Sequence, residues 1–299
     1  MLTLKCKNCG GEMSVDSSGL LFCDYCGNKY AFNDSELTGY RNFRLEMLNY
    51  LRGVHDEKSS GENREDILWN NAETVVLKNA DGKDITIKYL YSYSDDICTS
   101  YLAKETAIYV FDKKHVNIAA DWLENINKLS YPPADVKGLE DCFPKFLGKY
   151  ELSDKCMMLA FERSKNLFPL SMFGSLAPEH VAWIISRLEN ICCVFNYSDI
   201  VHGNINENNV WINPFNHHAV LMGGWNDVRA LDNNNKDLCD IRKTGLKVLG
   251  IHKDESNQPF IDFLNSAPSV DAYTDFEKWD RVIEVGFGGR RFAKMETTF

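Results

Sequence analysis

The chain has 299 residues, 44% apolar and 25% charged, which is enough for one large bilobal domain or two ordinary ones. Its formal net charge of -10 makes nucleic acid or anionic lipid an unlikely class of partner, because such binding needs a basic face. No stretch approaches the roughly 18 apolar residues of a membrane span, and the start lacks the apolar core of a signal peptide. We therefore expect a cytoplasmic protein with no membrane contact.

Two closely spaced cysteine pairs, each followed by glycine, define a first unit at residues 1–33. The four cysteines are Cys6, Cys9, Cys23 and Cys26. Two cysteines separated by two residues can direct both sulfurs at one ion, and the glycine permits the tight turn. The pattern predicts a closed, structural Zn²⁺ site in a zinc ribbon, since so short a segment relies on metal to fold. The alternative is a loop with free thiols.

The spacer between the cysteine pairs suits a short hairpin that carries apolar residues at Met13, Val15, Leu20, Leu21 and Phe22. Lysines and acidic residues balance each other in this unit, and four thiolates make the metal site itself anionic. We therefore expect the ribbon to contact another protein, with nucleic acid as the less favoured partner.

Residues 34–66 are predicted to form a helix and a polar linker. The helix spans residues 35–52, with Asp34 or Ser35 as its cap and Gly53 as its end. Residues 55–66 are polar and contain Gly and Ser, which favours a flexible linker.

The next part, residues 67–163, is rich in predicted strands and contains one helix. Strands at 73–78 and 84–90 flank residues 79–83, whose Asp-Gly pair predicts a hairpin turn. Further strands are expected at 100–103, 106–111, 143–152 and 155–162. Between them, Val116, Ala119, Leu123, Ile126 and Leu129 share one face at helical spacing, which predicts a helix over 113–129.

The last part, residues 164–299, is predicted to be mostly helical. A long amphipathic helix covers 179–197, with Pro178 at its start. A short strand pair follows at 209–212 and 219–222, and further helices are expected at 238–249, 259–264 and 273–285. The GFGG at residues 286–289 follows a helix and is interpreted as a turn.

The run from Val201 to Val210, VHGNINENNV, resembles the protein-kinase catalytic loop H-R-D-x-x-x-x-N. It follows a long helix and precedes a strand, as that loop does. His202 and Asn209 match the first and last positions, and the resemblance implies that His202 is a packing residue that braces the activation segment. Asn204 stands where kinases have the aspartate that accepts the substrate proton, and a carboxamide cannot act as that base.

The segment AVLMGGWND resembles the strand and turn that carry D-F-G in kinases. The metal-binding aspartate is expected at about Gly223, which has no side chain to ligate Mg²⁺. Asp227 lies four residues further on and is the only nearby substitute. The resemblance leaves Asn209 as the one remaining metal ligand, so binding of ATP and Mg²⁺ is doubtful.

The segment from Asp240 to Gly245 resembles the D-x-x-x-x-G of the central helix in the kinase C-lobe. The resemblance implies that Asp240 hydrogen-bonds backbone groups of the catalytic loop. In the strand-rich half it implies a lysine on the third strand paired with a glutamate on the helix. Glu124 is the candidate glutamate, but residues 106–111 contain no lysine, and Lys88 and Lys104 are poorly placed.

These features predict an α+β fold: a bilobal, protein-kinase-like domain with a β-rich N-lobe at 67–163 and a helical C-lobe at 164–299, preceded by the zinc ribbon. The resemblance covers about residues 70–297, and the simple scaffold, sparse motifs and fused ribbon resemble those of uncharacterised bacterial or phage kinase-like proteins. The alternative is an unrelated α+β domain in which the same polar residues only form turns.

Three functions are compatible with the sequence. The first is a pseudokinase, inactive as an enzyme, that acts as a regulatory scaffold for another protein, with the zinc ribbon as a second docking module. The second is an atypical phosphoryl or nucleotidyl transferase that uses Glu207 and Asp227 in a remodelled ATP pocket. The third is a zinc-ribbon factor associated with nucleic acid.

Two other groups of residues could suggest chemistry. Adjacent His217 and His218, near His202 in sequence, are one candidate for a second metal site, but we expect a solvated loop. Cys192 and Cys193 lie in the middle of a predicted helix with no basic neighbour, so we expect inert thiols and no nucleophile.

Overall fold

The computed structural model describes residues 72–132, 138–232 and 235–290, four short strands before them, and Met47, Trp69 and Met295. The predicted linker at 55–66 lies outside the described residues. Of the helix expected at 35–52, only Met47 is described; it is helical and fully buried.

The four short strands form an antiparallel sheet in the order β1 (Leu4–Lys5), β2 (Glu12–Val15), β3 (Leu21–Cys23) and β4 (Lys29–Tyr30). β2 and β3 pair as the expected hairpin, with Met13 opposite Cys23. Three of the four predicted zinc ligands, Cys6, Cys9 and Cys26, lie outside the described residues. The zinc site therefore stays a prediction.

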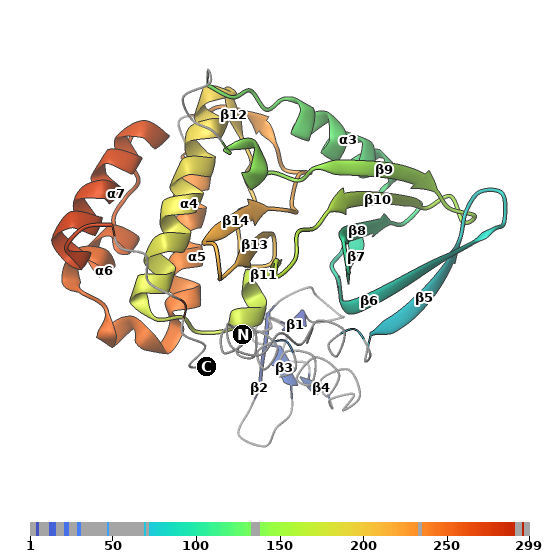
Figure 1. The fold of residues 1–299 in the computed structure, drawn as a ribbon, viewed down its shortest axis with the longest axis horizontal. Coiled ribbons are helices and arrows are strands. Elements are labelled where there is room, and N and C mark those ends of the chain that lie inside the picture. Colours follow the sequence, from blue (N-terminus) through green and yellow to red (C-terminus); the bar gives the residue numbers. More distant parts are fainter. Residues whose placement is uncertain are drawn as a thin grey trace, which may run out of the picture.

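A six-stranded antiparallel sheet follows, and its strands agree with those expected from the sequence. The strands are β5 (Glu73–Lys78), β6 (Asp84–Ser94), β7 (Cys98–Ala103), β8 (Thr106–Phe111), β9 (Phe146–Glu151) and β10 (Met157–Glu162), in the spatial order β5-β6-β7-β8-β10-β9. The helix α3 (Val116–Asn127) connects β8 to β9 and packs against the sheet, as Figure 1 shows.

The β5–β6 hairpin curls the sheet toward its opposite edge. Its turn needs glycine at Gly82, where φ is +78°, and Asn79 closes the turn by accepting the N–H of Lys83 at 2.8 Å. Asn79 also forms a β-bridge with Leu152, just beyond β9. Because of this closure, the face of the sheet away from α3 has an apolar cluster of its own, which includes Ile108 and Met158.

The remaining elements form the helical half of the protein. Its helices are α4 (Pro178–Tyr197), α5 (Lys236–Leu249), α6 (Gln258–Asn265) and α7 (Ala272–Phe287), with short 3₁₀ segments η2 (Glu140–Cys142), η3 (Leu170–Phe173) and η4 (Gly250–Glu255). Its short strands are β11 (Phe168–Pro169), β12 (Ile200–Val201), β13 (Val210–Asn213), β14 (His218–Leu221) and β15 (Arg229–Ala230). α4 begins with Pro178 in its first turn, as expected, and its buried residues recur at helical spacing.

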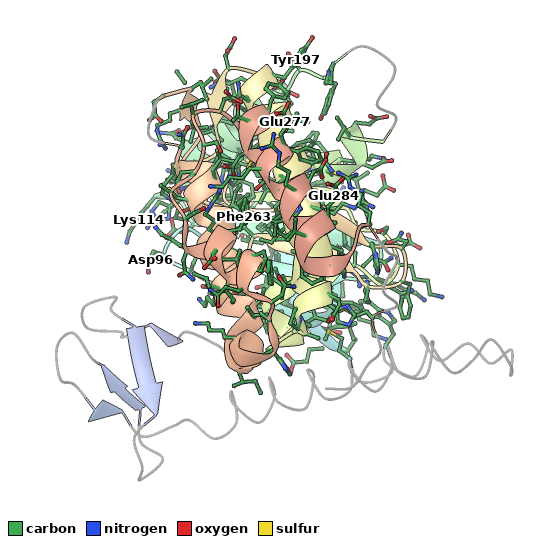
Figure 2. All side chains as sticks on the ribbon, turned by 90° about the vertical axis from the view of Figure 1, so that its left-hand side faces the viewer. Asp96, Lys114, Tyr197, Phe263, Glu277 and Glu284 are labelled. Atoms are coloured by element: carbon green, nitrogen blue, oxygen red, sulfur yellow. The ribbon has the colours of Figure 1, made fainter. Side chains whose placement is uncertain are left out.

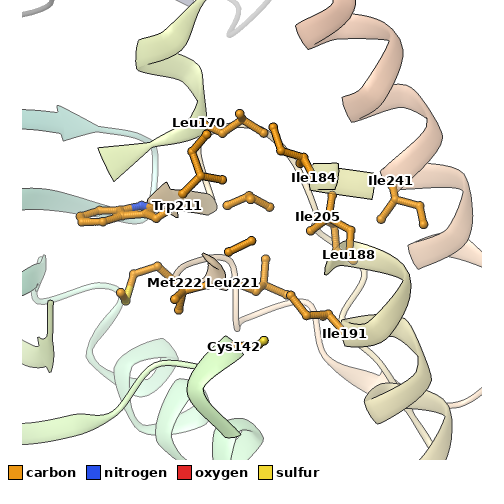
Figure 3. Close-up of a cluster of buried hydrophobic side chains, with 14 of the residues drawn as sticks. Cys142, Leu170, Ile184, Leu188, Ile191, Ile205, Trp211, Leu221, Met222 and Ile241 are labelled. Carbon is orange, nitrogen blue, oxygen red and sulfur yellow. The ribbon is translucent and has the colours of Figure 1, made fainter. Parts of the chain in front are cut away.

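The core of this half lies between α4 and the β13–β14 hairpin. Figure 3 shows Ile184, Leu188 and Ile191 of α4 facing Trp211 and Leu221 of the hairpin. α5 closes the far side of α4, and Gly245 allows the close approach. A Cβ on Gly245 would lie 2.9 Å from both Ile185 Cδ1 and Leu264 Cδ2.

A buried ion pair fastens α7 to α5. Arg242 Nη2 donates to both carboxylate oxygens of Asp275, at 2.9 and 2.7 Å, and both side chains are almost fully buried. The Arg242 guanidinium also lies 4.3 Å from the ring centroid of Phe263 of α6, which Figure 2 labels among the helices at the front of the view. Loss of either charge would leave the other buried alone, which is strongly destabilising. Among the described residues, no helix has the length and apolar character needed to cross a membrane.

Candidate functional site

The loop after β12 carries the sequence motif, and His202 anchors it in the core. His202 has no exposed surface; its ring stacks on Phe195 and meets Trp225 edge to face, with centroids 5.6 and 4.8 Å apart. Burial lowers the pKa of His202 from 6.5 to about 3. The residue is therefore a neutral packing group that joins the loop to the turn after β14. Trp225, which follows Gly223 and Gly224, is fully buried.

Two carboxylates at the start of α5 hold the backbone of this loop. Asp237 accepts the N–H groups of His202 at 2.8 Å and Gly203 at 2.7 Å. Asp240 accepts from the backbone of Ile205 and pairs with Lys236. The kinase resemblance implied that Asp240 hydrogen-bonds the backbone of this loop. Asp240 does so at one residue, whereas Asp237 does so at two. Burial raises the pKa of Asp237 to about 6 although both N–H groups stabilise its charged form.

Asparagine amides hold the loop together from within. Asn206 accepts the N–H groups of Asn208 and Asn209 through its Oδ1, at 2.9 and 3.2 Å. Its Nδ2 donates to Oδ1 of Asn204 at 2.7 Å, and Nδ2 of Asn209 donates to the carbonyl of Asn204 at 2.9 Å. Each of these amides is thus engaged with the loop itself.

The carboxylate of Asp227 lies beside the side chain of Asn204, which stands at the position of the missing base. Its Oδ2 accepts from Asn204 Nδ2 at 2.9 Å, and the pair lies at the surface. The other acid named from the sequence, Glu207, is 5% exposed and forms an ion pair with Lys247. Glu207 is therefore engaged in a structural contact, and only Asp227 adjoins the position of the missing base.

The turn at Gly223 and Gly224 packs directly against the side-chain amide of Asn209. A Cβ on Gly223 would lie 2.7 Å from Asn209 Oδ1, and a Cβ on Gly224 would lie 2.5 Å from Asn209 Nδ2. Gly224 also has φ of +81°, which disfavours other residues. A carboxylate at either position would require Asn209 to move.

An aromatic contact joins β8 to α3, where the kinase resemblance implied an ion pair between a lysine and a glutamate. Tyr109 of β8 and Trp122 of α3 are 5% and 2% exposed, and their ring centroids are 4.9 Å apart. Glu124, the glutamate named from the sequence, is exposed, as are Lys88 and Lys104. These three residues are therefore not brought together as a buried pair.

α3 is also tied to the turn after β14. Asn125 is 5% exposed, and its Nδ2 donates to the carbonyl of Trp225 at 2.8 Å. Lys128 donates in turn to Asn125 Oδ1 at 2.7 Å. The helix of the strand-rich half is thus hydrogen-bonded to the same turn that packs against His202.

A pocket lies between the sheet and the helical half. We call it the interlobe pocket. Its walls come from β6, β7, β8, α3, η3, the loop after β12 and β13. Its aromatic residues are Tyr91, Tyr93, Tyr109, Trp122 and Trp211, and its polar ones include Asn204, Asn208, Asn209 and Asn226.

The interlobe pocket is acidic. Asp95 is the one charged residue among the described residues that line it. Asp95 lies in the β6–β7 turn, which contains no glycine, and its Oδ1 accepts the N–H groups of Ile97 and Cys98 at 2.8 and 2.9 Å. Burial, and next the charge of Asp95, raise the pKa of both Tyr93 and Cys98. The carboxylate therefore acts on the pocket wall as a negative charge.

The other residues considered from the sequence lie apart from this pocket. His217 is 6% exposed and stacks on Trp183 at 4.6 Å, so our expectation of a solvated histidine loop was wrong for this residue. No group of three or more His, Cys, Asp or Glu side chains suited to a metal occurs in the described part of the chain. Cys192 is buried, and burial raises the pKa of both Cys192 and Cys193, as expected for inert thiols.

Sequence reasoning missed Asp237, Tyr109 and Asn125. An aromatic residue in the middle of a buried strand marked Tyr109, whereas Asn125, between Glu124 and Ile126, had no local signal. Asp237 lies less than one helical turn from Asp240, so sequence spacing alone could not decide between them.

No known family model and no curated protein matches this sequence. Among solved structures, vaccinia related kinase 3 is similar, with a TM-score of 0.53, 12% identity, and coverage of 78% of this chain and 99% of that chain. The BubR1 kinase domain has a TM-score of 0.49 at 8% identity, covering 67% of this chain and 80% of that one. WbdD has a TM-score of 0.45 at 13% identity, covering 69% and 47%. The first of these likenesses agrees with the sheet, helix and loop arrangement described above, and the chain has a protein-kinase-like fold.

Proposed function

We propose that this protein is a pseudokinase, a kinase-like scaffold without phosphoryl-transfer activity that regulates another protein through binding. The observation that carries the proposal is the turn at Gly223 and Gly224, which packs against Asn209 and carries no metal-binding carboxylate. Without that ligand, Mg²⁺ and the phosphates that it neutralises have no built site.

The charges around the interlobe pocket support the same proposal. Phosphoryl transfer depends on cations that stabilise the charge on the phosphates. Of the described residues that line the pocket, none is Lys or Arg, and Asp95 places a negative charge there instead. Tyr109 and Trp122 supply packing at the β8–α3 contact but no charge.

The scaffold, by contrast, is well braced. His202, Asp237 and Asn125 connect the loop, α5, α3 and the turn after β14 through buried contacts. Such a body can present a fixed surface to a partner with little ordering cost on binding. The predicted zinc ribbon, with Cys6, Cys9, Cys23 and Cys26 as ligands, would be a second docking module.

Two experiments test the proposal. The first is calorimetric titration of the zinc-loaded protein with ATP, with and without Mg²⁺. The second is a phosphate-transfer assay in which an active protein kinase is the positive control. We expect no Mg²⁺-dependent binding and no transfer. Mg²⁺-dependent binding, or transfer that is lost in Asn209→Ala but kept in the distant control Asn265→Ala, would refute it.

The second candidate, an atypical phosphoryl or nucleotidyl transferase, draws support from one contact: the hydrogen bond between Asp227 and Asn204 places a carboxylate beside the position of the missing base. If this function holds, Asp227→Asn abolishes transfer while Asp232→Asn, a nearby control, keeps it. No transfer by the unsubstituted protein would dismiss this candidate.

A further inference from the structure

The interlobe pocket combines aromatic walls with negative charge. Tyr91 and Tyr93 of β6, Tyr109 of β8, Trp122 of α3 and Trp211 of β13 all line it. Aromatic faces carry a negative quadrupole and attract organic cations, most strongly where water is partly excluded. Such walls suit a ligand with positive charge and an apolar stem.

A carboxylate adds to this attraction, because Asp95 is the one charged residue among the described residues that line the pocket. A second carboxylate, Asp227, is not part of the lining but lies 2.9 Å from Nδ2 of Asn204, which is. A nucleotide, whose phosphates are anionic, meets repulsion here, whereas a cation is attracted.

One buried donor at the pocket lacks a partner. The indole Nε1–H of Trp122 is buried and donates to no acceptor in the described part of the chain, although the residue lines the pocket. A buried donor without an acceptor is costly, so a ligand that brings a carbonyl or hydroxyl oxygen gains from this group.

We propose that the interlobe pocket binds an alkylammonium or guanidinium group in place of a nucleotide. This inference deepens the proposed function and rests on it: the cleft of the scaffold recognises a basic ligand. A Lys or Arg side chain in a peptide has this chemistry and also brings carbonyl oxygens for Trp122. A free polyamine has the same cationic chemistry without them.

The test is calorimetric or NMR titration of the full chain with matched probes at low salt. Butylamine and butan-1-ol differ in charge at nearly equal shape, and spermidine and the capped peptide acetyl-Gly-Arg-Gly-amide represent the two sources. We expect butylamine to bind at least about tenfold more tightly than the alcohol. Tighter binding of the peptide assigns the site to a protein ligand, and tighter binding of spermidine assigns it to free amines; either supports a cation site.

Asp95→Asn is the decisive variant, because Asn can keep the Oδ1 bonds to Ile97 and Cys98 while the charge is lost. We expect affinity for each cation to fall about tenfold or more. Asp81→Asn, in the β5–β6 turn and outside the pocket lining, is the matched control and should bind as the unsubstituted chain does. Tyr93→Leu should weaken binding about threefold, and Tyr93→Phe should restore it.

Equal binding of butylamine and butan-1-ol, unchanged affinity in Asp95→Asn, or no binding of any cation at up to about 50 mM would overturn the proposal. An ATP titration of the same samples separates this failure from that of the proposed function. Mg²⁺-dependent ATP binding refutes both, whereas absence of both ATP and amine binding refutes only the cation site.

Discussion

The contact between Tyr109 and Trp122 allows the sharpest energetic test of the site. Both rings are nearly fully buried, and their centroids lie 4.9 Å apart at an interplanar angle of 59°. Tyr109→Leu should cost about 2–3 kcal/mol and Trp122→Leu about 2–4 kcal/mol, through lost burial and a residual cavity. An aromatic pair in this geometry contributes about 0.5–1.5 kcal/mol beyond its buried area. The double variant should therefore cost less than the sum of the single variants by that amount.

Urea unfolding followed by circular dichroism measures these free energies, because the signal does not depend on the tryptophan that is replaced. Tyr89→Leu is the control partner: Tyr89 packs against the apolar cluster on the other face of the sheet. Combined with Tyr109→Leu it should be additive within about 0.5 kcal/mol. If Trp122→Leu does not fold, Trp122→Phe replaces it. A coupling energy for Tyr109 and Trp122 no larger than that of the control pair would refute the reasoning that this contact fastens α3 to β8.

Three further outcomes are expected. The first concerns His202, which the unfolded chain protonates below pH 6.5 but the folded chain only near pH 3. Lowering the pH from 7 to 5 should therefore reduce the unfolding free energy of the unsubstituted protein by about 2 kcal/mol more than that of His202→Phe, as measured by parallel urea titrations. Gly224→Asp should lower the unfolding free energy by about 1–3 kcal/mol more than Gly82→Asp, because both glycines have φ near +80° but only Gly224 lies against Asn209. Gly224→Asp should also not create Mg²⁺-dependent ATP binding. Equal destabilisation of the two variants in thermal unfolding would contradict the clash with Asn209. Chelation should release one Zn²⁺ per chain, as measured by a colorimetric metal assay, and should leave the main unfolding transition in place. Retention of zinc by Cys23→Ser would contradict the predicted set of ligands.

Local patterns predicted the elements of this fold well. The alternation of apolar residues and the Asp81-Gly82 pair predicted the β5–β6 hairpin, and the helical spacing after Pro178 predicted α4. In α3 the period was right, but the most buried side chains are Ala119, Trp122 and Asn125. The predicted face does pack against the core, with Ala119 fully buried and the other four residues partly buried. The burial of Asn125 was not predicted, because an asparagine with a partner 100 residues away has no local signature.

The same limit explains the errors at the site. The sequence indicated that α5 supplies an aspartate to the loop, but only the docking of α5 on the loop places Asp237 against His202 and Gly203. The burial of His217 depends on a stack with Trp183, from a different element, in a turn with φ of +51° at His217. Contacts of this kind are set by tertiary packing, and one sequence carries no direct signal for them.

The amides of the loop support the proposed binding function. Asn209, the one metal ligand that the sequence motif keeps, donates through Nδ2 to the carbonyl of Asn204, and Asn206 holds the amide of Asn204 in turn. This network fixes the Asn209 side chain with its Oδ1, the atom that would bind a metal, near the turn at Gly223 and Gly224, and these glycines offer an ion no carboxylate. At Asp95 a charge and aromatic walls are already in place, so the organic cation that we propose there needs no new ligand. The residues of the loop are thus an argument for the proposed binding cleft over a phosphoryl-transfer site.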